Sequence, residues 1–360
     1  MASLGKRKEL FMNKMQAMIF QKHGTPENLE YAFVPRPVPG HGEVLVKVRA
    51  VALNHLDLWA LMGMRNVAIP LPHVPGCDIS GEVIEKGPGV KGIPLGKPVI
   101  VAPGVSCGTC SYCKSGWDSL CPKYNILGLQ RNGGYAQFAA VPARNIIPVS
   151  KKISFEAWAA VPLVYLTAWH MLVTRANLKK GETVLIHAAG SGVGSAGIQI
   201  AKYLGAKVIT TVGSDKKAQI AKKLGVEHVI NYRKTDFPAE IMKITKARGV
   251  EVVLEHIGPE TFQASLACLA KKGRLVTCGV TSGPTTQLDI RFVFARQLSI
   301  IGCYMGGLPE LKSVIRLIEK GQLKPVLDEV FPLREARKAL ERMESRANFG
   351  KIILVPPHKD

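Results

Sequence analysis

The amino-acid sequence predicts an α/β protein in which a β-rich first part is followed by a doubly wound parallel sheet. Two observations predict this class. Residues 43–51 (EVLVKVRAV) alternate apolar and polar side chains, as a half-buried strand does, and further short strand-like runs follow. From about residue 155 onward, short apolar runs alternate with helical segments, which is typical of parallel strands joined by crossover helices.

The first part is predicted to consist of short strands separated by proline and glycine. After the strand at residues 43–51, the next strands are expected at residues 81–85 and 98–102. The second part begins with the apolar run 183–188, which a glycine cluster and a helix at 196–204 follow. Its further predicted elements are a strand at 207–212, a helix at 215–224, and strands at 228–230, 250–254 and 274–278. The strand-like residues 351–355 are expected to return to the first part.

Composition and charge limit the classes of protein that the chain can represent. Its 360 residues are 47% hydrophobic, which supplies a core for each of two domains. The 48 basic and 27 acidic residues give a net charge of +21, but the basic residues are dispersed along the chain. Such a surface attracts phosphorylated small molecules and leaves nucleic acid as an alternative partner. The longest apolar stretch, 157–173, is too short to span a membrane and contains Pro162, so we expect a cytoplasmic protein.

Four of the eight cysteines lie within residues 107–121, in the run C-x2-C-x2-C-x7-C. Four thiolates this close in sequence can converge on one tetrahedral ion, as in a structural zinc site. An iron–sulfur cluster is one alternative, although the last spacer of the comparable ferredoxin run has about three residues. Two disulfides are the other, but the remaining cysteines are dispersed, which suits a reducing compartment. We predict one structural zinc per chain, held by Cys107, Cys110, Cys113 and Cys121.

A dinucleotide site is predicted where the strand at 183–188 meets the next helix. The intervening residues, 188–194, read AAGSGVG. Glycines let the backbone approach a pyrophosphate, and the helix N-terminus offers free N–H groups. A glycine cluster alone would also suit a simple tight turn, but its place between a strand and a helix favours phosphate binding. The predicted contacts are Gly190, Ser191, Gly192, Val193 and Gly194.

The end of the following strand indicates which nicotinamide cofactor binds. An NAD site needs an acidic side chain there to accept hydrogen bonds from the ribose 2′-hydroxyl. The chain instead reads VGSDKK at 212–217, and its one acid, Asp215, comes after the strand and could equally cap the next helix. Ser214 and Lys217 can hold a 2′-phosphate. These residues favour NADP(H) over NAD(H).

The cysteine run, the glycine loop and the order of the two parts together resemble the medium-chain dehydrogenase/reductase superfamily over residues 15–355. Further stretches that carry the resemblance are GEVLVKVRAVALNHLD (42–57), VPGCDISGEV (74–83), GGYAQF (133–138), LTAW (166–169) and GKIIL (350–354). The resemblance implies a GroES-like catalytic domain at 15–163, with a zinc lobe at 107–121, a Rossmann domain at 164–304, and a return to the catalytic domain at 305–360. Residues 1–14 would form an N-terminal extension. A homodimer or homotetramer is implied as well.

Alcohol dehydrogenases of this superfamily hold a second, catalytic zinc, and the sequence departs from their pattern at each ligand position. The first cysteine ligand aligns with Asn54, and the His-Glu pair aligns with Cys77-Asp78. The later cysteine aligns with Leu163, whose side chain has no donor atom. The chain is instead similar to the quinone oxidoreductase branch, which lacks catalytic zinc and uses NADPH, although that branch typically lacks the cysteine lobe too.

The resemblance to this branch also assigns cofactor contacts. Ser214, Lys217 and Tyr232 would surround the 2′-phosphate of NADP. Further contacts implied by the resemblance are Thr167, Gly279 and Lys351.

Chemistry without a catalytic metal limits the reaction. Oxidising a simple alcohol needs a metal ion to stabilise the alkoxide, whereas hydride addition to a conjugated double bond or a quinone places charge on a carbonyl oxygen. We therefore expect an NADPH-dependent reductase of enals, enones, enoyl thioesters or quinones, acting on a small hydrophobic or thioester substrate. Asn54, His55 and Thr167 are the candidate catalytic residues, although Asn54 could equally be a turn residue that bonds its own backbone, and His55 a histidine that faces solvent.

Two other functions stay open on the sequence. One is a zinc-dependent alcohol dehydrogenase with a rebuilt metal site, in which Cys77 joins some of His55, His73, Asp57 and Asp78. The other is an RNA-binding or structural protein of the zeta-crystallin type, which the charge of +21 keeps in view.

Overall fold

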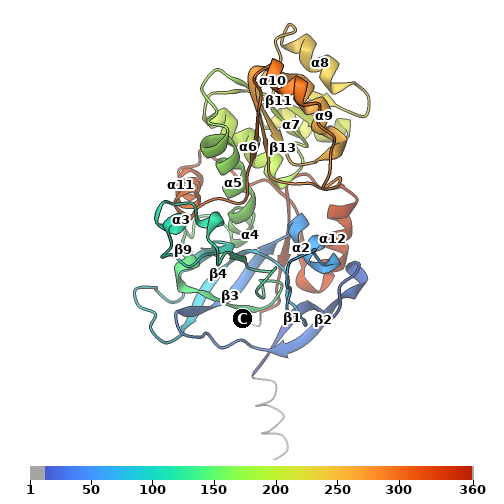
Figure 1. Ribbon diagram of the computed structural model, residues 1–360. Helices are drawn as coiled ribbons and strands as arrows, with labels where there is room; N and C mark the ends of the chain where they lie inside the picture. The colour runs from blue at the N-terminus through green and yellow to red at the C-terminus, as the bar shows by residue number, and fades with distance from the viewer. Residues whose placement is uncertain (1–12, 359–360) are drawn as a thin grey trace, which may run out of the picture. The chain divides into compact units, whose positions relative to one another are not determined.

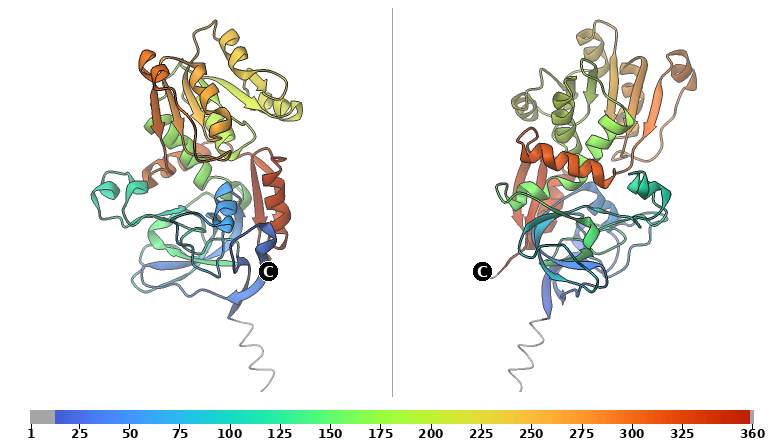
Figure 2. Two further views of the ribbon diagram at one scale, coloured as in Figure 1. Left: turned by 45° about the vertical axis from the view of Figure 1, so that its right-hand side comes forward. Right: turned by 90° about the vertical axis from the view of Figure 1, so that its left-hand side faces the viewer.

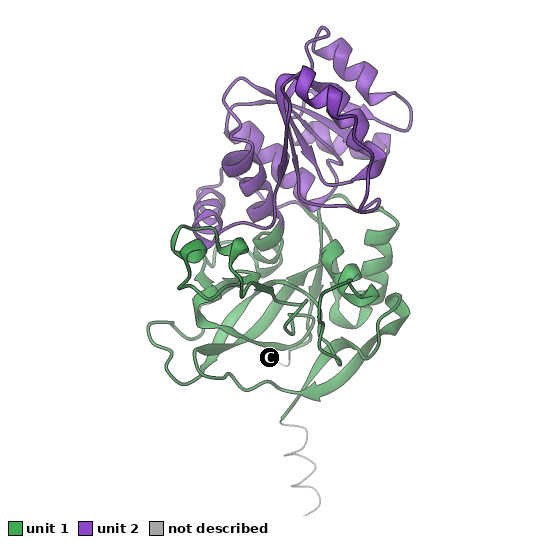
Figure 3. Ribbon diagram, in the orientation of Figure 1, with its two compact units in different colours: residues 1–163, 327–360 green, residues 164–326 purple. Residues whose placement is uncertain are grey.

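The computed structural model describes residues 13–358, which divide into two compact units (Figure 3). Unit 1 comprises residues 1–163 and 327–360, and unit 2 comprises residues 164–326. The predicted N-terminal extension lies mostly outside the described residues, because its residues 1–12 are not among them. The first described strand, β1, already begins at Lys14.

Unit 1 is built on a seven-stranded sheet in the order β16-β17-β3-β4-β5-β9, with β8 paired to β3. Its pairs are antiparallel except for β16 with β17. The strands of this sheet are β3 (Glu43–Ala52), β4 (Asp78–Lys86), β5 (Pro98–Val101), β8 (Phe138–Pro142), β9 (Ile146–Pro148), β16 (Leu327–Pro332) and β17 (Lys351–Val355). Two smaller pairs are β1 (Lys14–Phe20) with β2 (Leu29–Pro35), and β6 (Gly104–Val105) with β7 (Asn125–Ile126). The β-rich first part is thus confirmed.

The C-terminal segment completes this sheet. Strand β17 pairs with β3 in the register Ile353↔Ala52 and Leu354↔Val51, and β16 adds a strand that the sequence did not predict. Figure 1 shows β16, β17 and α12 in red among the blue and green elements of unit 1. The helices of this unit are α2 (His55–Met62), α3 (Ser111–Lys114), α4 (Phe155–Ala159) and α12 (Ala336–Glu344), while α5 (Pro162–Trp169) begins here and continues into unit 2.

Unit 2 is a six-stranded parallel sheet in the order β12-β11-β10-β13-β14-β15. The strands are β10 (Thr183–Ile186), β11 (Lys207–Val212), β12 (His228–Asn231), β13 (Val250–Glu255), β14 (Leu269–Thr277) and β15 (Ser299–Gly302). The helices are α6 (Gly192–Tyr203), α7 (Asp215–Lys223), α8 (Phe237–Ile244), α9 (Pro259–Cys268), α10 (Ile290–Ala295) and α11 (Leu308–Glu319). Their succession from green to orange can be followed in Figure 2. The predicted doubly wound sheet is confirmed.

The return of the chain to unit 1 occurs later than the residue 305 that we expected from the sequence. Helix α11 belongs to unit 2, and the second boundary lies between residues 326 and 327. The reason is a set of contacts at the start of α11. The Glu310 carboxylate accepts from the Gly307 backbone N–H at 2.8 Å and lies 3.0 Å from the His170 ring, which is buried in the π-helical segment His170–Arg175.

Each unit buries its own apolar side chains. In unit 2, for example, Leu185, Val253 and Leu275 from neighbouring strands pack with Leu266 of α9. Over residues 13–358, no helix is both long enough and apolar enough to cross a membrane.

Candidate active site and cysteine cluster

The glycine loop lies between β10 and α6, as the sequence predicted for a pyrophosphate site. Ser191 is the N-cap of α6, and its hydroxyl accepts a hydrogen bond from the Gly194 N–H at 2.8 Å. A β-carbon on Gly194 would lie 2.2 Å from the Ala188 carbonyl oxygen, so only glycine fits this position. The loop therefore presents a tight helix N-terminus of the kind that binds phosphate groups.

The residues predicted to hold a 2′-phosphate lie together where β11 and β12 end. Ser214 caps helix α7, and its hydroxyl accepts from the Lys217 N–H at 3.3 Å. The Tyr232 phenol lies against Gly213 at the end of β11. A β-carbon on Gly213 would be 2.7 Å from the Tyr232 hydroxyl oxygen. Parallel neighbours β11 and β12 end side by side, in the register Val212↔Asn231, which explains why Tyr232 lies against Gly213.

Asp215, the acidic residue that follows the end of β11, already has hydrogen-bond partners. The Asp215 carboxylate accepts from Lys234 Nζ at 2.5 Å and from Asn231 Nδ2 at 2.8 Å. These hydrogen bonds, led by the one from Lys234, lower the pKa of Asp215. Sequence reasoning missed Lys234, which adds a cation to the corner.

The positions that align with catalytic zinc ligands are brought together in unit 1, around the buried Asp78 carboxylate. This carboxylate accepts from the Leu163 backbone N–H at 2.7 Å, from Asn54 Nδ2 at 2.9 Å and from Lys351 Nζ at 3.0 Å. Cys77 Sγ lies 3.4 Å from the same Asn54 nitrogen. We call Asn54, Cys77, Asp78, Leu163 and Lys351 the Asp78 cluster.

Lys351 supplies the positive charge of the Asp78 cluster. Its side chain is 4% exposed, and its ammonium also donates to the Leu53 carbonyl and to Asn54 Oδ1, both at 2.5 Å. Three acceptors match the three N–H bonds of an ammonium group. From the sequence we expected Lys351 to bind cofactor. In the structure the pairing of β17 with β3 brings its side chain against Asn54, and the cofactor contact stays a prediction.

Asp57 fixes the turn that carries Asn54. Its carboxylate accepts from the Asn54 N–H at 2.8 Å, from the Tyr135 hydroxyl at 2.9 Å and from the Gly76 N–H at 3.2 Å. Burial raises the pKa of Asp57 to about 6 against the effect of these bonds. Asn54 is the N-cap of α2 in a capping box with Asp57, so a structural role for both residues is built into the fold.

The other candidate residues lie in different places. His55 is exposed on the first turn of α2 in unit 1. Thr167 is buried in α5 and belongs to unit 2. Gly279 follows β14, and a β-carbon there would lie 3.1 Å from the His256 carbonyl oxygen. His73, a candidate ligand for a rebuilt zinc site, is fully buried with its ring 5.3 Å from that of Phe20.

Cys107, Cys110, Cys113 and Cys121 form a compact cluster in unit 1. Their sulfur atoms all lie within 4.8 Å of one another, and among the described residues this is the one group of three or more such side chains with spacing suited to a metal. Zinc–sulfur bonds of about 2.3 Å place tetrahedral sulfurs about 3.8 Å apart. The Cys107–Cys113 and Cys110–Cys113 distances are 3.9 and 3.5 Å. All four thiols are free of disulfides.

Backbone N–H groups point at these sulfurs, as thiolate ligands require. Gly108 N donates to Cys113 Sγ at 3.3 Å, and Cys110 N donates to Cys107 Sγ at 3.4 Å. Hydrogen bonds from Thr109 and Cys110 lower the pKa of Cys107 to about 5. The donor set thus fits a tetrahedral zinc ion, which would pin the lobe without offering an open coordination position.

Comparison with known proteins agrees with both units. Residues 40–151 match the alcohol dehydrogenase GroES-like domain family, and residues 192–320 match the zinc-binding dehydrogenase family. The crystal structure of an NAD-dependent alcohol dehydrogenase is 44% identical, with a TM-score of 0.91, and covers 95% of this chain and 99% of its own.

Two similar proteins carry names of reductases. Acryloyl-coenzyme A reductase of Metallosphaera sedula is 30% identical over 94% of this chain and 99% of its own length. Quinone oxidoreductase 1 of Escherichia coli is 33% identical over 94% of this chain and 98% of its own length. The fold and these matches define an oxidoreductase. The chain belongs to the medium-chain dehydrogenase/reductase superfamily.

Proposed function

We propose that this protein is an NADPH-dependent reductase that transfers hydride to an activated double bond or a quinone without a catalytic zinc ion. Enals, enones, enoyl thioesters and quinones are the substrate classes. A single structural zinc in the cysteine cluster belongs to the proposal.

The Asp78 cluster is the observation that carries the proposal. A catalytic zinc site needs three protein donor atoms with free lone pairs and an open fourth position. Here the Asp78 carboxylate is already paired with the Lys351 ammonium, and Leu163 contributes a backbone N–H in place of a ligand. Burial raises the pKa of the Cys77 thiol well above its usual value, which disfavours the thiolate form that binds metal. These features oppose a second zinc.

The reaction that suits a site without catalytic zinc is hydride addition to an activated double bond. NADPH supplies the hydride when it is bound. Adding hydride to the β-carbon of an enone or enoyl thioester moves the electron pair onto the carbonyl oxygen, and the α-carbon then takes a proton. Neutral hydrogen-bond donors are enough to stabilise that oxygen. His55 and Thr167 remain the candidate donors, since the Asn54 amide nitrogen already faces three acceptors, Asp78 Oδ2, the Ala52 carbonyl oxygen and Cys77 Sγ.

The named relatives support this class of reaction. Acryloyl-coenzyme A reductase and quinone oxidoreductase 1 both bear names of enzymes that reduce such groups. An alcohol dehydrogenase is also among the similar structures, and so the substrate class needs a direct test.

The first test combines metal counting with a panel of substrates. We expect about one zinc per chain, NADPH-dependent reduction of at least one enal, enone, enoyl thioester or quinone, and no oxidation of simple alcohols. Cys77→Ala should leave both the zinc content and the reductase activity nearly unchanged, because Cys77 would bind no metal. Two zincs per chain, with alcohol turnover that is lost in Cys77→Ala, would instead establish the rebuilt alcohol dehydrogenase site.

Cofactor preference provides a second test. We expect NADPH to bind much more tightly than NADH, because bonds from Lys217, Ser214 and Tyr232 to a 2′-phosphate are charge-assisted and worth roughly 1.5–3 kcal/mol each. The double substitution Ser214→Asp, Lys217→Ala should erode or reverse the preference, as measured by dissociation constants for both cofactors.

Lys216→Ala is the matched control for that pair. Lys216 is the exposed neighbour of Lys217 on the same helix, and its loss should change the preference little. Equal affinity of the wild-type protein for NADPH and NADH would refute the assignment of this corner to the 2′-phosphate.

A further inference from the structure

The loop that follows β13 lies next to the glycine loop that follows β10. The chain runs from β10 outward through β11 to β12 and then returns to β13 on the other side of β10. In doubly wound sheets, ligands bind outside the carboxyl ends of the strands at such a switch point. The glycine loop follows β10, and His256 is the first residue after β13, so His256 lies at this switch point beside the predicted pyrophosphate site.

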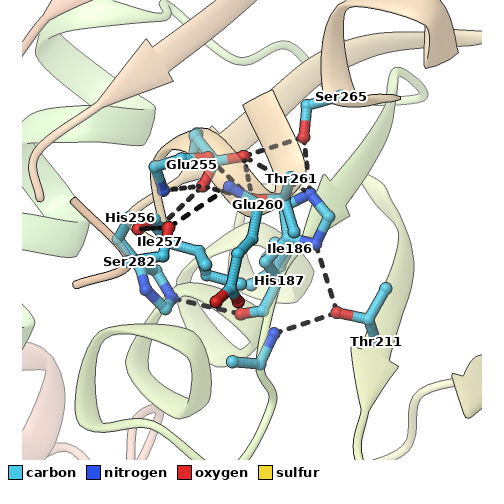
Figure 4. Close-up of polar contacts among 12 residues, drawn as sticks. Ile186, His187, Thr211, Glu255, His256, Ile257, Glu260, Thr261, Ser265 and Ser282 are labelled. Atoms are coloured by element: carbon cyan, nitrogen blue, oxygen red, sulfur yellow. Dashed lines mark hydrogen bonds and ion pairs between the residues drawn. The ribbon is translucent and has the colours of Figure 1, made fainter. Parts of the chain in front are cut away.

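The His256 ring contacts the glycine loop directly. Its Nε2 lies 3.2 Å from the His187 carbonyl oxygen, a contact drawn in Figure 4, and 3.3 Å from Ser191 Oγ. Because a carbonyl oxygen can only accept, Nε2 carries the hydrogen of the neutral ring. The opposite nitrogen, Nδ1, is therefore an acceptor.

The same contact orients the Ser191 hydroxyl. Its oxygen accepts from the Gly194 N–H at 2.8 Å and shares the hydrogen on His256 Nε2. A hydroxyl oxygen has two acceptor positions and one hydrogen. With both acceptor positions occupied, the Ser191 hydrogen is left to donate to a third group, and a phosphate oxygen at the helix N-terminus is a suitable acceptor.

The buried Glu255 carboxylate accepts hydrogen bonds from the backbone of the loop that carries His256. Glu255 Oε1 accepts from the Ile257 N–H at 2.7 Å and from the Gly258 N–H at 3.2 Å. The Thr261 hydroxyl lies 2.9 Å from the other Glu255 oxygen. Glu255 is fully buried, and Figure 4 shows these bonds converging on it.

A second histidine, His187, connects the Glu255 carboxylate to neighbouring strands through hydrogen bonds. His187 Nε2 lies 2.8 Å from Ser265 Oγ, which in turn donates to Glu255 at 2.8 Å. His187 Nδ1 lies 3.2 Å from the Thr211 hydroxyl of β11. Burial lowers the pKa of His187 to about 4, so this ring is neutral and structural. The loop that carries His256 is therefore preorganised.

We propose that His256 is a cofactor-binding residue whose Nδ1 accepts a hydrogen bond from a hydroxyl of the nicotinamide ribose while its Nε2–H orients Ser191 toward the pyrophosphate. This inference rests on the proposed function. The adenosine half is assigned to the corner of Ser214 and Tyr232 on the β11 side. The nicotinamide half then extends past β13, where ribose hydroxyls can donate to the His256 ring.

The test compares the whole cofactor with its adenosine half. Calorimetry should show that His256→Phe weakens NADPH binding about tenfold, the effect of one or two lost hydrogen bonds. Affinity for adenosine 2′-monophosphate, which lacks both the pyrophosphate and the nicotinamide ribose, should stay within about twofold. His256→Asn keeps an acceptor near the position of Nδ1 and should retain most of the NADPH affinity.

His228→Phe is the control, because His228 begins β12 at the opposite end of the sheet. If His256→Phe does not fold, His256→Ala takes its place, since the side chain is only partly buried. Unchanged NADPH affinity, or an equal loss for NADPH and the monophosphate, overturns the role of His256. A wild-type protein that binds neither NADPH nor NADH overturns the proposed function itself.

Discussion

Replacing Lys351 by methionine is expected to lower the free energy of unfolding by roughly 3–5 kcal/mol, because it leaves the buried Asp78 carboxylate without its counter-ion. Methionine keeps most of the volume of the lysine stem, so the loss reports mainly on charge and hydrogen bonding. Chemical denaturation of the apo protein measures it. The same substitution would also remove the hydrogen bond that the Lys351 ammonium donates to Asn54 Oδ1.

The coupling between Lys351 and Asp78 is tested by a second substitution. Adding Asp78→Asn to Lys351→Met removes the uncompensated charge, and the double variant should be clearly more stable than the sum of the two single effects implies. Lys338→Met is the matched control. Its side chain is 69% exposed, and the change should stay within about 0.5 kcal/mol. Strictly additive losses would show that the Lys351–Asp78 pair contributes no coupling.

Substituting Cys110 by serine is expected to abolish stoichiometric zinc binding and to lower the melting temperature by several degrees. The free energy of zinc binding at such a site is part of the free energy of folding, and three thiolates with one hydroxyl form a much weaker site. Metal analysis and thermal denaturation of the purified variant measure the two effects together. Addition of a strong chelator to the wild-type protein should reproduce the lower melting temperature.

Ser115→Ala is the control for the cysteine cluster. Ser115 lies in the same lobe and is exposed. Its hydroxyl donates to the Tyr112 carbonyl oxygen at 3.1 Å. Zinc content and melting temperature should therefore match the wild type. Full zinc occupancy in Cys110→Ser would contradict the assignment of this thiol as a ligand.

The features that the sequence predicted correctly share one property, which is that their residues are neighbours along the chain. The four cysteines lie within residues 107–121, and the glycine loop joins β10 directly to α6. The strand β3 and the strand–helix succession after residue 180 depend on patterns that each segment carries by itself, although β3 is buried over most of its length and not on one face alone. Strand ends were less certain, and β16 was missed because its mostly exposed residues show no buried alternation.

The Asp78 cluster could be anticipated in part only. Alignment with zinc ligands pointed to Asn54, Cys77, Asp78 and Leu163, but it did not show that Asp78 accepts from the Leu163 N–H or that Lys351 neutralises its carboxylate. His256 carried no motif, and its relation to Ser191 depends on β10 and β13 being adjacent in the sheet.

By itself, then, the sequence determined the two-part α/β architecture, the cysteine cluster and the position of the glycine loop between a strand and a helix. Each of these depends on side-chain types and spacing within a few turns of chain. Tertiary structure alone decided where Lys351 points, since the register Ile353↔Ala52 between β17 and β3 places its ammonium against Asn54 and Asp78. Pairing between strands some three hundred residues apart is set by the packing of the whole unit, because no local propensity specifies a long-range register.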